Sequence, residues 1–176
     1  FKDNHAPKRP KRLPCDVHHF VNNGEKWLAF IGLLDGRPYE VFAGKESAFD
    51  IPTTAVTGEI VKEKKNGDSR YDYHYTHYNK PKVQEGLSEV FHREYWNYAK
   101  FISMILRHGA PIQYVVDVMG DLDVEEDHIS TWKRGLMRIM KKYIPNGESS
   151  GMDCPECGGE MVMQENCPTC RDCNFQ

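Results

Sequence analysis

Asn-Gly and Asp-Gly dipeptides between runs of strand-forming residues constrain the fold of this chain more than any other feature. Asn23-Gly24, Asp35-Gly36 and Asn66-Gly67 all lie in such positions. These dipeptides readily adopt the positive φ values that a two-residue turn between antiparallel strands requires. The first two therefore predict a three-stranded meander over residues 15–43, and the third predicts a hairpin over residues 58–76.

The segment between the first two turns is apolar on both of its faces. It reads Lys26-Trp-Leu-Ala-Phe-Ile-Gly-Leu-Leu34, and successive side chains of a strand point to opposite faces. Other parts of the chain must therefore cover both sides of this strand.

A row of tyrosines marks the returning strand of the predicted hairpin. Tyr71, Tyr73 and Tyr75 alternate with polar residues, which indicates a half-exposed strand that ends before Pro81. Such a row most often packs across neighbouring strands. The alternative is that its rings stack on nucleic-acid bases.

The rest of the domain is expected to be helical. Apolar residues spaced three and four apart predict a first helix from Ser88, as its N-cap, toward His108. Gly109 is its expected stop. A second, short helix is expected over residues 111–119, with proline at its first position.

A third helix is expected from about His128 to Tyr143, with Asp127 as its N-cap. Its predicted buried stripe consists of Ile129, Trp132, Leu136, Ile139 and Met140. Its basic side chains lie on or beside the other face: Lys133, Arg134, Arg138, Lys141 and Lys142. This basic stripe is expected to be solvated, with phosphate contact as the alternative.

Cysteines are concentrated at the end of the chain. Five of the six lie in a short window, namely Cys154, Cys157, Cys167, Cys170 and Cys173. Two Cys-x-x-Cys pairs separated by a short strand have the spacing of a zinc ribbon, in which each pair directs two thiolates at one tetrahedral ion. The predicted fold is therefore α+β: an antiparallel meander and hairpins packed with three helices, followed by a small C-terminal zinc ribbon.

Five thiols exceed by one what a closed zinc site needs. Cys154 and Cys157 form the first pair, and we favour Cys170 and Cys173 as the second because Asn174 follows them. Asparagine tolerates the left-handed backbone that ends such a turn, as Gly158 does after Cys157. Cys167 is then an unligated thiol, either a redox group or a spare cysteine; the alternative pairs Cys167 with Cys170 on the metal.

Composition and the positions of proline and glycine divide the chain into four parts. The proline-rich residues 1–14 form an extended basic linker, and residues 15–144 form the α+β domain. Residues 145–153 are expected to be a flexible linker, and residues 154–176 form the zinc-ribbon module.

The general composition limits the class of protein. The net charge of −3 argues against a nucleic-acid binder, and no apolar run approaches the roughly 18 residues of a membrane span. Clustered Cys-x-x-Cys pairs are typical of a reducing compartment, so we expect a cytoplasmic protein. No nucleotide-binding or hydrolase motif is present, so the residues alone indicate no reaction.

Four collinear stretches of the chain resemble the C-terminal portion of adenosylcobalamin-dependent, or class II, ribonucleotide reductases. They are residues 5–19, residues 32–44, residues 102–112 and the cysteine-rich end from Cys154. In that family the catalytic barrel lies upstream and holds the radical cysteine and the cobalamin and nucleotide contacts. The resemblance thus implies that this chain, which has none of the barrel, is an accessory part of ribonucleotide reduction or the small chain of a split enzyme.

The resemblance also implies partners and a redox role. The catalytic subunit would carry adenosylcobalamin, the tail cysteines would relay electrons to its disulfide, and a thioredoxin-like donor would reduce the tail. The sequence ends at Asn174-Phe-Gln176 without the final cysteine of such tails, which leaves Cys167 as the redox candidate. The competing hypothesis is a zinc-ribbon adaptor or regulator that binds protein or nucleic acid without catalysis.

Overall fold

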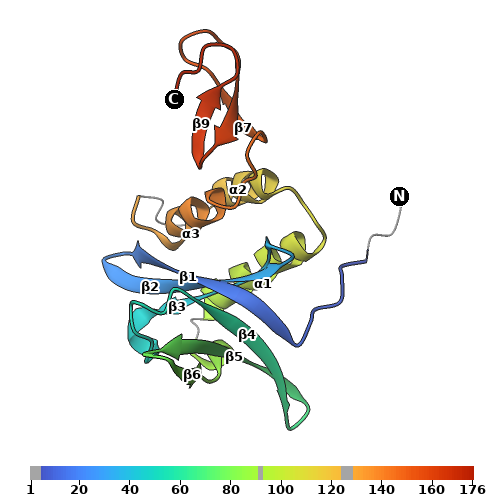
Figure 1. The fold of residues 1–176 in the computed structure, drawn as a ribbon, viewed down its shortest axis with the longest axis vertical. Coiled ribbons are helices and arrows are strands. Elements are labelled where there is room, and N and C mark those ends of the chain that lie inside the picture. Colours follow the sequence, from blue (N-terminus) through green and yellow to red (C-terminus); the bar gives the residue numbers. More distant parts are fainter. Residues whose placement is uncertain (1–4, 91–92, 124–128) are drawn as a thin grey trace.

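The computed structural model of the chain describes residues 5–90, 93–123 and 129–176 (Figure 1). Six strands form an antiparallel sheet in the order β3-β2-β1-β4-β5-β6. Their bounds are β1 Arg12–Asn22, β2 Glu25–Leu34, β3 Arg37–Lys45, β4 Thr57–Lys65, β5 Asp68–His77 and β6 Lys80–Gln84. The helices are α1 Arg93–Arg107, α2 Ile112–Gly120 and α3 Trp132–Lys141. A second, three-stranded sheet contains β7 Ser149–Asp153, β8 Glu160–Gln164 and β9 Cys167–Cys170, so the predicted α+β class is confirmed.

The predicted turns form as expected. Asn23-Gly24 joins β1 to β2, Asp35-Gly36 joins β2 to β3, and Asn66-Gly67 joins β4 to β5. The φ values of all these residues lie between 50° and 89°. Local turn chemistry therefore sets the pairing of five of the six strands in the large sheet.

Strand β2 is covered on both faces, as its apolar sequence requires. Trp27, Ala29 and Ile31 are buried against the side chains of the three helices. Leu28 and Phe30 are buried on the opposite face in a second cluster, with residues of β1, β3, β4 and β5. Figure 1 shows α2 and α3 on one side of β2 and β4–β6 on the other side.

Helix α1 protects the free edge of the sheet. Strand β3 is an edge strand, and the backbone N–H of Val41 donates to the Ser103 hydroxyl of α1 at 3.0 Å. The same hydroxyl donates to the carbonyl of Ala99, 2.7 Å away in the helix. The side chain of Ser103 thus satisfies an edge amide that would otherwise be open to pairing with another chain.

The first helix begins later than predicted but ends where predicted. Ser88 lies in a short 3-10 turn over Leu87–Glu89 and does not cap α1, which begins at Arg93. Gly109 follows α1 with a φ of 78°. Its backbone N–H donates to the carbonyl of Leu106, so it serves as the expected helix stop.

The third helix is shorter than predicted. Helix α3 begins at Trp132, and the side chain of Thr131 caps it by accepting from the backbone N–H of Arg134 at 3.3 Å. The cap expected at Asp127 lies outside the described residues.

Two residues differ from the predicted arrangement of α3, one just before the helix and one within it. Ile129 precedes the helix and is 77% exposed, because the helical periodicity does not extend to it. Lys133 was expected on the solvated face but is buried, and its ammonium donates to the carbonyl of Leu122 at 2.8 Å. The other members of the stripe are buried as predicted: Trp132, Leu136, Ile139 and Met140.

Strand β6 is an element that the sequence did not predict. Tyr78 and Asn79 form a tight turn with φ values of 47° and 58°, and the chain continues as a strand through Pro81. Because β6 is the edge of the sheet, proline is tolerated there without loss of a buried hydrogen bond.

Both predicted linkers are more ordered than expected. Strand β1 already begins at Arg12, and the side chain of Arg9 is 8% exposed where it pairs with Glu40. In the second linker, residues 149–153 form β7. The backbone also exchanges hydrogen bonds between Gly147 or Glu148 and Met163, because the segment adds a strand to the ribbon.

The small sheet rests on the helical side of the domain (Figure 1). Met163 of β8 is 4% exposed and belongs to the same hydrophobic cluster as Ile112 of α2 and Ile144. The ribbon is therefore packed against the helices through a buried side chain. No helix in the described part of the chain is both long and apolar enough to cross a membrane.

Candidate metal centre

Two turns of the same design present the cysteines. After β7, the backbone N–H of Gly158 donates to the carbonyl of Cys154, and the N–H of Cys154 donates to the carbonyl of Gly159. At the end of β9, the N–H of Asn174 donates to the carbonyl of Cys170, and the N–H of Cys170 donates to the carbonyl of Phe175. The second turn thus repeats the first, residue for residue.

The left-handed positions of both turns are those the sequence predicted. Gly158 has a φ of 71°, and Asn174 has a φ of 58°. Asparagine is among the few residues with a side chain that adopt this conformation readily. The choice of Cys170 and Cys173 as the second pair rested on this turn, and the backbone has the expected form.

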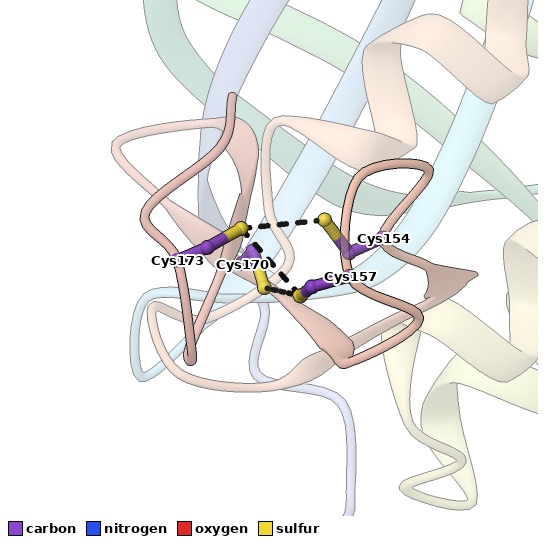
Figure 2. Close-up of side chains that lie close together, drawn as sticks. All are labelled: Cys154, Cys157, Cys170 and Cys173. Atoms are coloured by element: carbon purple, nitrogen blue, oxygen red, sulfur yellow. Dashed lines mark hydrogen bonds between the residues drawn. The ribbon is translucent and has the colours of Figure 1, made fainter.

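The four sulfurs of these turns converge (Figure 2). All four lie within 4.8 Å of one another. The Sγ atom of Cys154 lies 3.6 Å from that of Cys173, and the Sγ of Cys157 lies 3.5 Å from those of Cys170 and Cys173. Zn–S bonds of about 2.3 Å place tetrahedral sulfurs about 3.8 Å apart. The four thiols therefore fit a tetrahedral ion with little rearrangement.

Backbone amides favour the thiolate form of Cys170, whereas the pKa values of Cys157 and Cys173 are raised in part by hydrogen bonds from neighbouring thiols. The N–H of Cys173 lowers the pKa of the Cys170 thiol to about 7. The N–H of Asp172, which donates to the same sulfur at 3.4 Å, acts in the same direction. Amides that surround a sulfur in this way orient the ligand and stabilise its charge.

Close packing around the first turn requires a residue without a side chain. A Cβ atom at Gly159 would collide with the carboxylate of Asp172 and would lie 3.3 Å from the Sγ of Cys157. Beneath the turns, Met161 is buried with Cys154 and Cys170 in a small cluster. Asp172 and Met161 were not predicted as parts of the site, although their positions between and beside the cysteines could have indicated them.

The structure does not bring Cys167 into this group. Cys167 begins β9, opposite Gln164, and its side chain is exposed. The remaining cysteine, Cys15, is buried in the large sheet, and burial raises the pKa of its thiol well above the ordinary value. Among the described cysteines, Cys167 is thus the exposed thiol outside the cluster.

The tyrosine row is packed rather than open. Tyr73 is fully buried, and its hydroxyl donates to the carbonyl of Ala55 at 3.1 Å. Tyr75 stacks on Tyr73, with ring centroids 5.2 Å apart. The face of Tyr71 is occupied by the guanidinium of Arg9 and the ammonium of Lys62, at 5.4 and 5.9 Å from the ring centroid.

Comparison with known proteins assigns the larger part of the chain. No curated protein and no solved structure gives a significant match. A family model described as the NrdJ homologue C-terminal domain matches residues 13–145. The match spans the six-stranded sheet and the three helices and ends before β7. The chain therefore belongs to the NrdJ homologue C-terminal domain family, which is related to the ribonucleotide reductase NrdJ.

Proposed function

We propose that this chain is an accessory component of ribonucleotide reduction that works with a separate catalytic subunit. The observation that carries the proposal is the family match over residues 13–145. The six cysteines of the chain are accounted for by one buried thiol, one cluster of four and the exposed Cys167. The radical chemistry and the adenosylcobalamin are accordingly assigned to the partner.

The cysteine cluster is assigned a structural zinc ion. Four protein thiolates fill a tetrahedral site, so no position remains open for substrate or water, and the ion stabilises the ribbon without taking part in catalysis. Metal analysis of the purified chain should find about one zinc per chain. A Cys154→Ser or Cys173→Ser variant should lose it, while Cys167→Ser should retain it.

Cys167 is the thiol assigned to electron transfer. Its thiolate would attack the disulfide of the catalytic subunit, forming a mixed disulfide and releasing one subunit thiolate. One thiol of a thioredoxin-like dithiol would then attack the mixed disulfide at Cys167, bond to Cys167 and free the second subunit thiol. The donor's second thiol would attack this new bond, so that Cys167 leaves as a thiol and the donor leaves as its own disulfide. An outside dithiol is needed because the other exposed thiols belong to the metal cluster.

The test combines the chain with an adenosylcobalamin-dependent catalytic subunit and measures deoxynucleotide formation. Adding the chain should increase thioredoxin-driven turnover, and Cys167→Ser should abolish that increase. Turnover driven by dithiothreitol, which reduces the catalytic disulfide directly, serves as the control and should be equal for both forms. If Cys167→Ser supports full thioredoxin-driven turnover, the relay is wrong; if the wild-type chain never increases turnover, the accessory role itself is wrong.

A further inference from the structure

Two basic segments that lie far apart in the sequence come together on one surface. The first is Lys8-Arg-Pro-Lys-Arg12, and the second is Lys62-Glu-Lys-Lys65 on β4. The backbone N–H of Lys62 donates to the carbonyl of Lys11 at 2.8 Å, which extends the pairing of β1 with β4 beyond the start of β1. A shallow depression of about 660 Å³ lies between the two segments.

We define the basic patch as Lys8, Lys11, Lys62 and Lys64, which line this depression. Glu63 also lines the depression, and it pairs with Lys11 at 3.1 Å. Within the described residues, Lys8, Lys62 and Lys64 have no ion pair with an acidic side chain. The patch is thus a concentrated positive surface on a chain whose net charge is −3, so the rest of the molecule is correspondingly acidic.

The anchoring of the first segment fixes the patch in place. Arg9 turns inward from between Lys8 and Lys11 and donates to both oxygens of the fully buried Glu40, at 2.6 and 2.9 Å. Arg12 pairs with Glu59 at 2.6 Å on the neighbouring strand. The lysines are therefore held on an ordered backbone and not on a free tail, which lowers the entropy cost of binding through them.

The surroundings of the patch favour a protein partner over nucleic acid. A single-strand binder combines cations with open aromatic faces on which bases stack. The ring of Tyr71, which lies beside Lys62, already carries Arg9 and Lys62 over its face, and Tyr73 is buried. A long polyanion would also extend beyond the patch over the acidic remainder of the molecule, whereas the acidic face of a folded protein can match the patch alone.

We infer that the basic patch docks an acidic surface of the partner catalytic subunit. This inference rests on the proposed function, since it names the surface through which the accessory chain engages that subunit. Exposed charges of this kind accelerate encounter and set orientation more than they add affinity. They act within about 10 Å at 0.1 M ionic strength, so the association must weaken with salt.

The test reverses two charges and uses a matched control. Lys62→Glu/Lys64→Glu alters the patch, and Lys80→Glu/Lys82→Glu makes the same change of charge on exposed positions of β6. Association with the catalytic subunit is measured at 50 mM and 500 mM salt. The patch variant should associate at least about tenfold more slowly than wild type at low salt, with little difference at high salt, and the control should resemble wild type. Equal rates for the patch variant and the control overturn the inference, even if the chain still increases turnover.

Two further probes test the patch without the catalytic subunit. Poly-glutamate represents an acidic protein surface, and single-stranded DNA represents nucleic acid. Wild type should bind poly-glutamate at low salt, and the patch variant should lose that binding while the control keeps it. Failure of wild type to bind poly-glutamate, or tighter binding to DNA that the patch variant loses, overturns the assignment to an acidic protein. If the wild-type chain binds poly-glutamate but does not increase the turnover of the catalytic subunit, the proposed function is contradicted instead.

Discussion

At the scale of single residues, the buried Glu40 connects three distant parts of the chain. Its carboxylate is fully buried and accepts from Arg9 of the N-terminal segment and from Arg107 of α1, the latter at 3.1 Å. Gly32, its partner on β2, provides the necessary space, because a Cβ there would lie 2.7 Å from the Cγ of Glu40. A buried carboxylate is tolerated only with such compensation.

Removing this carboxylate should be costly. Glu40→Ala leaves the Arg9 and Arg107 guanidinium groups without their shared partner, so we expect a loss of about 3–5 kcal/mol in the free energy of unfolding. Glu59→Gln, which removes the exposed ion pair with Arg12, should cost about 1 kcal/mol or less. Denaturant unfolding of both variants measures the difference. Equal, small losses would show that Glu40 does not hold the N-terminal segment.

The same residues show where sequence reasoning stops. The turns at Asn23-Gly24 and after Cys157 depend on a few neighbouring residues, and the sequence predicted them correctly. The ion pair between Arg9 and Glu40 joins residues 31 positions apart, and nothing local distinguishes Arg9 from the exposed lysines beside it. Its burial therefore emerges only from the folded structure.

At the scale of elements, close packing of α3 on β1 depends on a glycine within the helix. A Cβ at Gly135 would collide with the ring of Phe20 and would lie 3.0 Å from its Cγ. Glycine is a poor helix former, so its place in the middle of α3 reflects this approach of helix to strand.

Alanine substitutions at a glycine in each of two helices distinguish the effect of packing on stability from the effect of helix propensity. Gly135→Ala should destabilise the protein by about 1–3 kcal/mol, because overpacking against Phe20 outweighs the gain in helix propensity. Gly120→Ala, at the end of α2, meets only the flexible end of Met137 at 3.4 Å and should be neutral or slightly stabilising. Thermal unfolding of the two variants compares them directly. A stabilised Gly135→Ala would mean that α3 can move away from the sheet.

Several features that the sequence did not predict depend on a partner that the local pattern does not reveal. Strand β6 follows a turn without glycine, at Tyr78 and Asn79, and β7 forms from a segment of linker-like composition because β8 offers it a partner. Lys133 is buried because a carbonyl at Leu122 lies within reach. In each case a neighbouring strand or carbonyl decides the structure, and the composition of the segment alone does not.

At the scale of the whole molecule, the ribbon and the helical domain form one connected core through Met163. If the cysteines hold zinc, removing the ion should melt the ribbon, because such small modules rarely fold without their metal. Met163 would then leave the hydrophobic cluster that it shares with the helices, so the helices should also lose stability.

Chelation of the metal tests this coupling. Adding a zinc chelator should lower the melting temperature of the whole chain, and Cys154→Ser should reproduce the effect, whereas Cys167→Ser should not. Acidification should mimic the chelator, since protons compete with the metal for the thiolates. A melting curve of the helical domain that is identical with and without chelator would show that the ribbon is energetically independent.

The buried Met163 shows that the segment matched by the family model and the hydrophobic core have different boundaries. The family match ends at residue 145, yet the hydrophobic cluster built by that segment is completed by a side chain 18 positions further on. A recombinant fragment cut at the family boundary would expose an apolar depression on its helices and tend to self-associate. The ribbon therefore covers the core of the matched segment, and the boundary of the family does not coincide with the boundary of the hydrophobic cluster.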